Sequence, residues 1–252
     1  MWQLNCSTFT RTLRYYRFVL LLALDTCDSR GSIALLNGDL VLGEILHPQA
    51  EDFSSWLLPA VRQLLADHCV SHADLAGYAV ASGPGSFTGV RVGLTTAKAW
   101  AEVYDKPIFP VSRLAILANL APRGASFVAA FIDAQRNQIF AALYRRDANA
   151  STTLIEESVI APDDFFSQAK RLAGDGLFWA TLDPAILQGS AFAGSHAIPA
   201  ANLTVAHPPL AAAIGLYIAA QPSPIRLDAL ALDANYVRRS DAEIFGKKTA
   251  IP

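Results

Sequence analysis

The stretch that decides the fold is Ala81-Ser82-Gly83-Pro84-Gly85-Ser86-Phe87-Thr88-Gly89-Val90-Arg91-Val92-Gly93. An apolar run precedes it and a long helical pattern follows it, so its glycines fall at a strand-to-helix turn. Glycines allow tight turns, and the first N–H groups of a helix lack partners within the helix, so such a loop can hold an anion. The residues placed to do so are Gly83, Gly85, Ser86, Thr88 and Arg91. The alternative is that the loop is only a tight turn and that Arg91 forms a surface salt bridge.

The segments around this loop predict a lobe that mixes strands and helices. A buried strand is expected over residues 77–81, before the loop, and a helix over residues 88–104, after it. Upstream, the chain is expected to open with three strands, over residues 20–25, 32–36 and 40–46. Asn37-Gly38 between the last two of these is a strong hairpin signal.

The opening pattern recurs in the second half of the chain. A strand expected over residues 127–133 ends in Asp133, as the first strand ends in Asp25, and a turn and another strand over residues 138–144 follow. Two copies of this pattern suggest an internal duplication, although two unrelated hairpins would give the same pattern. Strands mixed with helices, with a hairpin opening each half, predict an α/β protein with a mixed sheet in each half.

Helices are expected at four further places. One follows the opening strands, with apolar residues on one face, Leu58 off that face and Pro59 inside the pattern. Ser112 is the candidate N-cap of a second helix, which is expected near residues 113–120. The four are expected near residues 53–65, 113–120, 162–172 and 209–220.

Composition limits the function classes. The 252 residues carry a net charge of -2, so no excess of positive charge indicates a direct nucleic-acid binder. Charged residues make up 17% and hydrophobic residues 52% of the chain. Ordinary globular chains have about 25% charged residues, so either the core is large or another protein covers part of the surface. We favour the second explanation.

The N-terminus superficially resembles a secretory signal. Basic residues at 11–17 precede an apolar run over residues 18–24, but that run is short and ends in Asp25, so a buried strand explains it better. No apolar run is long enough to span a bilayer. We expect residues 1–17 to be a disordered extension, residues 18–122 to form one lobe, and residues 123–252 to form a second lobe with a polar tail.

The complete sequence of residues 82–93 closely resembles the signature of the TsaB family. Three further stretches fit the same family: Leu-Ala-Leu-Asp25-Thr, Phe131-Ile-Asp133-Ala and Tyr236-Val-Arg238-Arg239-Ser240-Asp241-Ala242-Glu243. The resemblance runs from about residue 20 to residue 243. One departure is His47-Pro48-Gln49-Ala50-Glu51, where the family often shows His-Ser-Glu at the start of its first helix.

This resemblance implies a duplicated actin-like and sugar-kinase-like fold with two lobes. It also implies a non-catalytic, cytoplasmic subunit without a cofactor. Its partner would be a TsaD-like paralogue, which transfers the threonylcarbamoyl group to the adenosine beside the tRNA anticodon. A TsaE-like ATPase would join the complex, and tRNA would be reached only through it. When alone, the chain would form a homodimer.

The resemblance assigns the partner contact to the two apolar helices on either side of residues 77–81. The second of these is apolar around nearly its whole circumference, so it is expected to be buried on more than one side. The expected contact residues are Leu57, Leu58, Val61, Leu94, Ala97, Trp100 and Ala101. The alternative is that both helices are internal.

Other chemistry is poorly supported. In kinase-type relatives a glycine-rich turn after a strand-end Asp wraps phosphates, but the turns after Asp25 and Asp133 lack an early glycine. An ATP-dependent phosphotransferase or ATPase of the same fold is therefore the second hypothesis. His68 and His72 have the spacing of a helical metal pair, but no carboxylate motif completes it, so a solvated helix end is preferred and no metal is expected.

Overall fold

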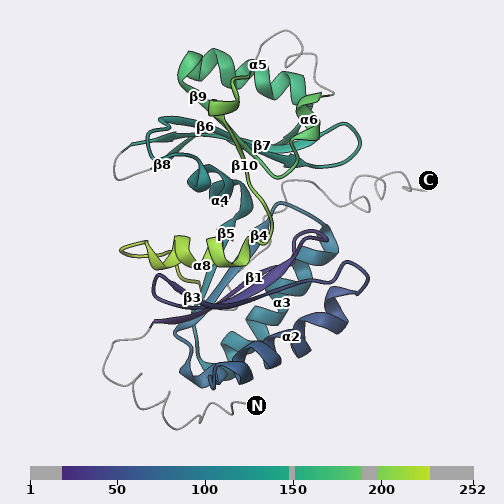
Figure 1. The fold of residues 1–252 in the computed structure, drawn as a ribbon, viewed down its shortest axis with the longest axis vertical. Coiled ribbons are helices and arrows are strands. Elements are labelled where there is room, and N and C mark those ends of the chain that lie inside the picture. Colours follow the sequence, from purple (N-terminus) through teal and green to yellow (C-terminus); the bar gives the residue numbers. More distant parts are fainter. Residues whose placement is uncertain (1–18, 148–150, 189–197, 228–252) are drawn as a thin grey trace, which may run out of the picture. The chain divides into compact units, whose positions relative to one another are not determined.

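A computed structural model describes residues 19–147, 151–188 and 198–227 (Figure 1). The expected disordered extension over residues 1–17 and the family-like ending at residues 236–243 lie outside the described residues. Among the described residues, 19–111 with 208–227 form one compact unit, and 112–147, 151–188 and 198–207 form a second. Within the described ranges, no helix is both long and apolar enough to cross a membrane.

The first unit is built on a five-stranded mixed sheet with the strand order β3-β2-β1-β4-β5. Its strands are β1 (Leu20–Asp25), β2 (Ser32–Asn37), β3 (Leu40–Leu46), β4 (Gly77–Gly83) and β5 (Ile108–Ser112). β1 pairs with β2 antiparallel and with β4 parallel. Every residue of β1 and β4 is buried, which explains why both read as near-continuous apolar runs.

Helices cover both faces of this sheet. They are α2 (Phe53–Asp67), the short η1 (His72–Asp74), α3 (Phe87–Tyr104) and α8 (Ala211–Ala219). Figure 1 shows α2 and α3 on one face and α8 on the other. α2 packs on β2 and β3, α3 on β4, and α8 on β1 and β2.

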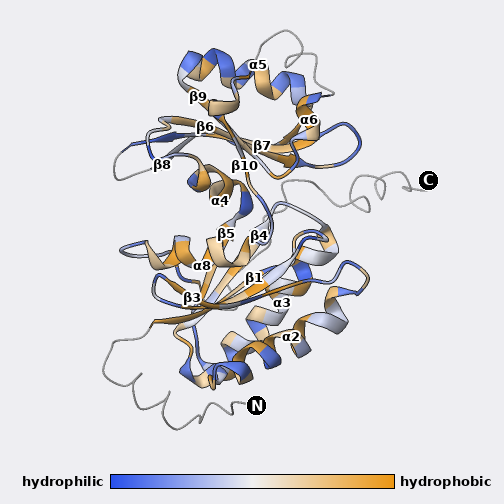
Figure 2. Ribbon diagram, viewed as in Figure 1, coloured by the Kyte–Doolittle hydropathy of each residue, from blue (hydrophilic) through white to orange (hydrophobic). Residues whose placement is uncertain are grey.

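The second unit has a five-stranded mixed sheet with the order β10-β9-β6-β7-β8. Its strands are β6 (Phe127–Asp133), β7 (Ile139–Arg146), β8 (Ser151–Ile160), β9 (Leu177–Thr181) and β10 (Leu203–Val205). Its helices are α4 (Arg113–Leu120), α5 (Pro162–Ala173), η2 (Gly174–Gly176), α6 (Ala185–Gln188) and η3 (Ala200–Asn202). Phe131, Phe166 and Trp179 form an aromatic core with edge-to-face ring contacts. Figure 2 shows polar residues alternating with apolar ones along α5.

The two sheets repeat one topology, which confirms the predicted duplication and the two-lobed actin-like α/β class. In each, an antiparallel three-stranded meander is followed by a strand parallel to the first strand of the meander. Ser112 caps α4 as expected, because its Oγ accepts hydrogen bonds from the N–H groups of Leu114 and Ala115. β8, β9 and β10 were not predicted.

The units do not follow the expected sequential division at residues 122 and 123. α4 lies in the first half of the sequence but packs on β6 and β7 of the second sheet. α8 lies in the second half but packs on β1 and β2 of the first sheet. The physical reason is that each half ends in an apolar helix that is buried against the sheet of the other half.

Side chains of the first sheet hold the N-terminus of α8. Ser32 Oγ accepts a hydrogen bond from the Ala211 N–H at 3.1 Å, and Glu44 Oε1 accepts one from the Ala212 N–H at 3.0 Å. These are amides that a helix leaves without internal partners. Burial raises the pKa of Glu44, and the Ala212 hydrogen bond opposes that shift. The charged carboxylate is therefore disfavoured in the folded state.

We predict that Glu44→Gln stabilises the protein at pH 7, whereas Glu44→Ala destabilises it. The folded pKa lies above the ordinary value, so folding stability falls as pH rises through the interval between the two. Glutamine keeps an oxygen acceptor for Ala212 and carries no charge to desolvate. Urea unfolding from pH 4 to pH 8 should show the advantage of Glu44→Gln shrinking as the pH falls.

The same change at the exposed Glu156 is the control, because no comparable burial applies there. An equal effect of Glu44→Gln at all pH values would contradict the assignment of a raised pKa.

Candidate functional site

The glycine-rich loop is docked on the turn that follows β1. Thr26 Oγ1 donates a hydrogen bond to the Gly89 carbonyl at 2.7 Å, and the Ser86 N–H donates to the Cys27 carbonyl at 2.6 Å. Thr26 and Cys27 are both buried. The strand-end turn is therefore occupied by the protein's own backbone on the side of the loop.

This docking explains why three positions of the loop are glycine. A Cβ atom at Gly85 would overlap the backbone of Cys27. At Gly89 it would overlap the carbonyl oxygen of Thr26, and at Gly93 the Thr26 hydroxyl. The glycines thus permit close approach between α3 and the turn, which gives them a packing role.

The residues predicted to hold an anion have internal contacts. Ser86 is the N-cap of α3, and its Oγ accepts a hydrogen bond from the Gly89 N–H at 3.4 Å. The Arg91 guanidinium lies over the Phe87 ring, 3.6 Å from its centroid, as in a cation–π contact. Gly83 ends β4, and Thr88 is exposed in the first turn of α3. Anion binding at this loop stays a prediction.

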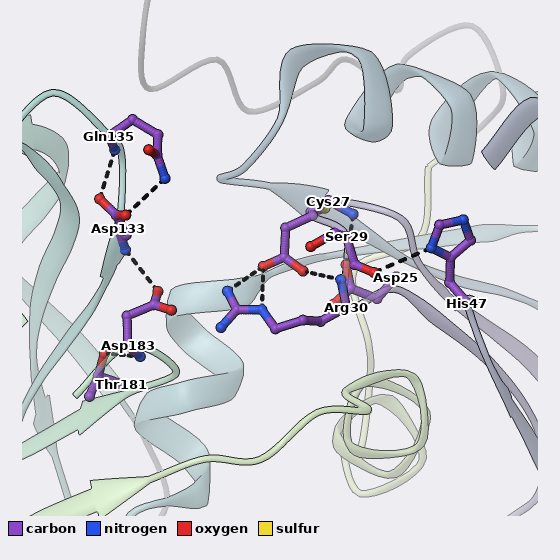
Figure 3. A network of polar contacts seen from close by, with 10 residues as sticks. Asp25, Cys27, Ser29, Arg30, His47, Asp133, Gln135, Thr181 and Asp183 are labelled. Carbon is purple, nitrogen blue, oxygen red and sulfur yellow. Dashed lines mark hydrogen bonds and ion pairs between the residues drawn. The ribbon is translucent and has the colours of Figure 1, made fainter. Parts of the chain in front are cut away.

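The turn after Asp25 is closed by its own side chains (Figure 3). Asp25 Oδ1 accepts a hydrogen bond from the Cys27 N–H at 3.0 Å. The Arg30 guanidinium forms an ion pair with Asp28 at 2.6 Å, and the Arg30 N–H bonds the same carboxylate at 2.9 Å. His47 Nδ1 lies 3.2 Å from the Ser29 carbonyl. The backbone amides of Cys27 and Arg30 thus bond carboxylates of the turn itself.

The turn after Asp133 is closed in a similar way. The Gln135 N–H donates to Asp133 Oδ1 at 2.8 Å, and the Asp133 N–H donates to Asp183 Oδ2 at 2.9 Å (Figure 3). Gln135, Arg136 and Asn137 have φ angles of 63°, 58° and 58°. This left-handed region favours glycine, and each non-glycine residue held there costs of order 1–3 kcal/mol. Bulky side chains therefore stand where a phosphate-wrapping turn would use glycine.

His68 and His72 do not form a pair. The two ring nitrogens of His68 each lie 2.9 Å from a carbonyl oxygen, one of Leu64 and one of Leu42. His72 Nδ1 contacts the Tyr78 hydroxyl at 3.0 Å, and burial lowers the pKa of His72. Among the described residues, no group of three or more His, Cys, Asp or Glu side chains could hold a metal ion.

The structure separates the predicted contact residues into two groups. The core of the first unit encloses five of them, so their side chains have no surface to offer a partner: Leu57, Val61, Leu94, Ala97 and Ala101. Leu58 is 54% exposed, and Trp100 is half-buried between His72 and Tyr78. The apolar stripe of each helix is thus the core-facing side.

The outward face of these helices carries residues that sequence reasoning missed. Val103, near the end of α3, is 73% exposed, and Ala99 and Thr95 are exposed about one and two turns before it. On α2, the predicted contact residue Leu58 is exposed, as is the neighbouring Pro59. Selecting the positions opposite the core stripe would also have found Thr95, Ala99 and Val103, because the two faces of a helix lie half a turn apart.

The repeated lobes define the duplicated actin-like, sugar-kinase-like class. The protein-family model described as "TsaD: tRNA N6-adenosine threonylcarbamoyltransferase" matches residues 41–220. The chain is 34% identical over 166 residues to the tRNA threonylcarbamoyladenosine biosynthesis protein TsaB of Escherichia coli, a match that covers 64% of this chain and 70% of that protein. The TsaB of Bacillus subtilis is 39% identical over 125 residues, which is 50% of this chain and 55% of that protein.

Solved structures give the same result. YeaZ from Pseudomonas aeruginosa is 29% identical with a TM-score of 0.61, covering 79% of this chain and 90% of that chain. A structure described as similar to peptidase YEAZ, from the same organism, is 27% identical with a TM-score of 0.67, covering 87% and 99%. The chain therefore belongs to the TsaB family. The sequence match spans about half the length of the B. subtilis relative.

We predict that Gly89→Ala lowers the free energy of unfolding by about 1–3 kcal/mol, because a Cβ there must displace α3 from the backbone of Thr26. Gly124→Ala is the matched control, since nothing lies within 4 Å of a Cβ at Gly124. Urea unfolding of both variants checks this. Equal stability of the two variants would show that the loop does not need glycine for docking.

Proposed function

We propose that this chain is a non-catalytic partner subunit of the machinery that forms N6-threonylcarbamoyladenosine in tRNA. The observation that carries the proposal is the closure of both strand-end turns by the protein's own groups. The related TsaB proteins are named for tRNA threonylcarbamoyladenosine biosynthesis, and we propose the same pathway for this chain. A phosphotransferase or ATPase of the same fold would need open turns with free backbone amides, so that alternative is not favoured.

The proposed partner is a TsaD-like catalytic subunit, bound at the outward face of α2 and α3. This face presents exposed apolar side chains, Leu58 and Val103, together with the small side chains Thr95 and Ala99. Small residues let another helix approach closely, and exposed apolar residues gain free energy when they are covered. In the absence of that partner, the same face would serve a homodimer.

Three further parts of the proposal follow from the family. A TsaE-like ATPase joins the complex and supplies the nucleotide chemistry that the closed turns of this chain do not provide. tRNA is reached only through the complex, which agrees with the net charge of -2. The protein acts in the cytoplasm, where tRNA is modified. No cofactor is proposed for this subunit.

The test is complementation in bacteria that lack their own TsaB. Wild-type protein should restore threonylcarbamoyladenosine in bulk tRNA, measured by mass spectrometry, and should co-purify with the TsaD-like protein. Leu58→Glu and Val103→Glu should each weaken co-purification by roughly 100-fold or more, because a carboxylate would be buried without a partner. Both variants should lower the modification.

Leu172→Glu is the matched control, because Leu172 is 53% exposed on α5 of the second unit, close to the 54% of Leu58. It should behave as wild type in both measurements. Failure of the wild-type chain to restore the modified nucleoside contradicts the proposed function. Normal co-purification of Leu58→Glu and Val103→Glu contradicts the proposed contact face alone.

A further inference from the structure

The first half of the chain ends in a helix that belongs to the other sheet. α4 follows β5 directly, yet the chain passes from the first unit to the second between Val111 and Ser112. α4 packs on β6, β7 and β9, and its residues Leu114, Ile116 and Leu117 are fully or almost fully buried there. The first sheet therefore receives no cover from the last helix of its own half.

The second half behaves reciprocally. The chain returns to the first unit between His207 and Pro208, and α8 follows. α8 packs on four strands of the first sheet, β1, β2, β3 and β4. Ala211, Ile214 and Ile218 are buried against it. No residue of α8 carries a charge, so this helix is poorly suited to exist in water without a sheet to cover.

Specific contacts fix each transferred helix to its sheet. On α8, Gly215 lies so close to Leu36 of β2 that a Cβ atom would overlap that side chain. The first two amides of α8 bond Ser32 of β2 and Glu44 of β3. These contacts require one register between α8 and the strands.

α4 is fixed by a corresponding set. Ser112 Oγ, the N-cap of α4, also donates a hydrogen bond to the carboxylate of Glu157 on β8, and the Tyr144 hydroxyl donates to the same oxygen at 3.1 Å. At the other end, Arg146 Nη1 donates to the carbonyls of Ala118 and Ala121, at 3.1 Å each. In both units a glutamate on the third strand of the meander, Glu44 or Glu157, thus bonds the start of the transferred helix or its cap.

We propose that the two halves of this chain, divided between residues 122 and 125, are reciprocal binding partners. Each half carries an uncovered sheet face and an apolar helix that fits the sheet face of the other half. The partner of each half is the complementary half of this same chain, and the covalent link between them is not needed to hold the fold. The two sheets consequently fold and unfold together. This inference does not rest on the proposed function.

The test cuts the folded full chain at the division. Pro122, Arg123 and Gly124 are exposed, and nothing surrounds a Cβ at Gly124, so a protease recognition sequence inserted there leaves the packing intact. Trp179 reports on the second unit, and Trp56 reports on the first. Variants that keep only Trp56 or only Trp179 of the four tryptophans of the chain allow urea unfolding of each sheet to be followed separately by fluorescence.

We expect the cut protein to elute from a sizing column as a single species, at the same position as the uncut chain. Trp56 and Trp179 should report the same urea midpoint of unfolding. That midpoint should rise with protein concentration only after the cut, because unfolding then separates two molecules. Midpoints that differ between the reporters, or that ignore concentration after the cut, would overturn the proposal, because independent units need no partner.

A matched pair of glycine variants separates the transferred helix from other sources of coupling. In the cut protein, Gly215→Ala should lower the midpoint reported by both tryptophans, because it loosens α8 on the first sheet. Gly176→Ala, where a Cβ meets nothing within 4 Å, should leave both unchanged. If Gly215→Ala lowers only the Trp56 midpoint, α8 does not couple the halves and the proposal fails.

Discussion

The close approach of the glycine-rich loop to the backbone of Thr26 and Cys27 is the contact on which the rest of the structure depends. It fixes α3 against the end of β1, through two hydrogen bonds and three positions that leave no space for a Cβ atom. The most distinctive motif of the sequence is thereby used inside the protein. The side of the first turn that faces the loop is consequently filled.

Because the protein's own groups fill both turns, the outer surface of the chain is what remains for contact with another molecule. Asp28 and Arg30 close the first turn, and Asp133 and Asp183 bond the amides of the second. The left-handed residues after Asp133 show that the second turn keeps a shape suited to glycine without the glycine itself. The outward face of α2 and α3, with Leu58 and Val103, is then the best-supported candidate for contact with another protein.

Local sequence predicted most elements but not their long-range placement. Asn37-Gly38 marked the first hairpin and Ser112 the start of α4, because turn and cap signals act over a few residues. β8 was missed because this half-exposed edge strand carries polar residues such as Glu156 and Glu157. Apolar periodicity located α2 and α3 but could not say what each face touches, so core residues such as Leu94 were assigned to an interface. The exchange of α4 and α8 between sheets has no local signature.

We propose that the closed turns make this chain a partner subunit and not an enzyme, and nucleotide titration is the most direct test of that proposal. ATP with Mg²⁺ is titrated into the purified full chain by calorimetry, and phosphate release is followed in the same samples. The account predicts no saturable heat and no turnover above the rate without protein. Saturable binding accompanied by metal-dependent release of phosphate would contradict it.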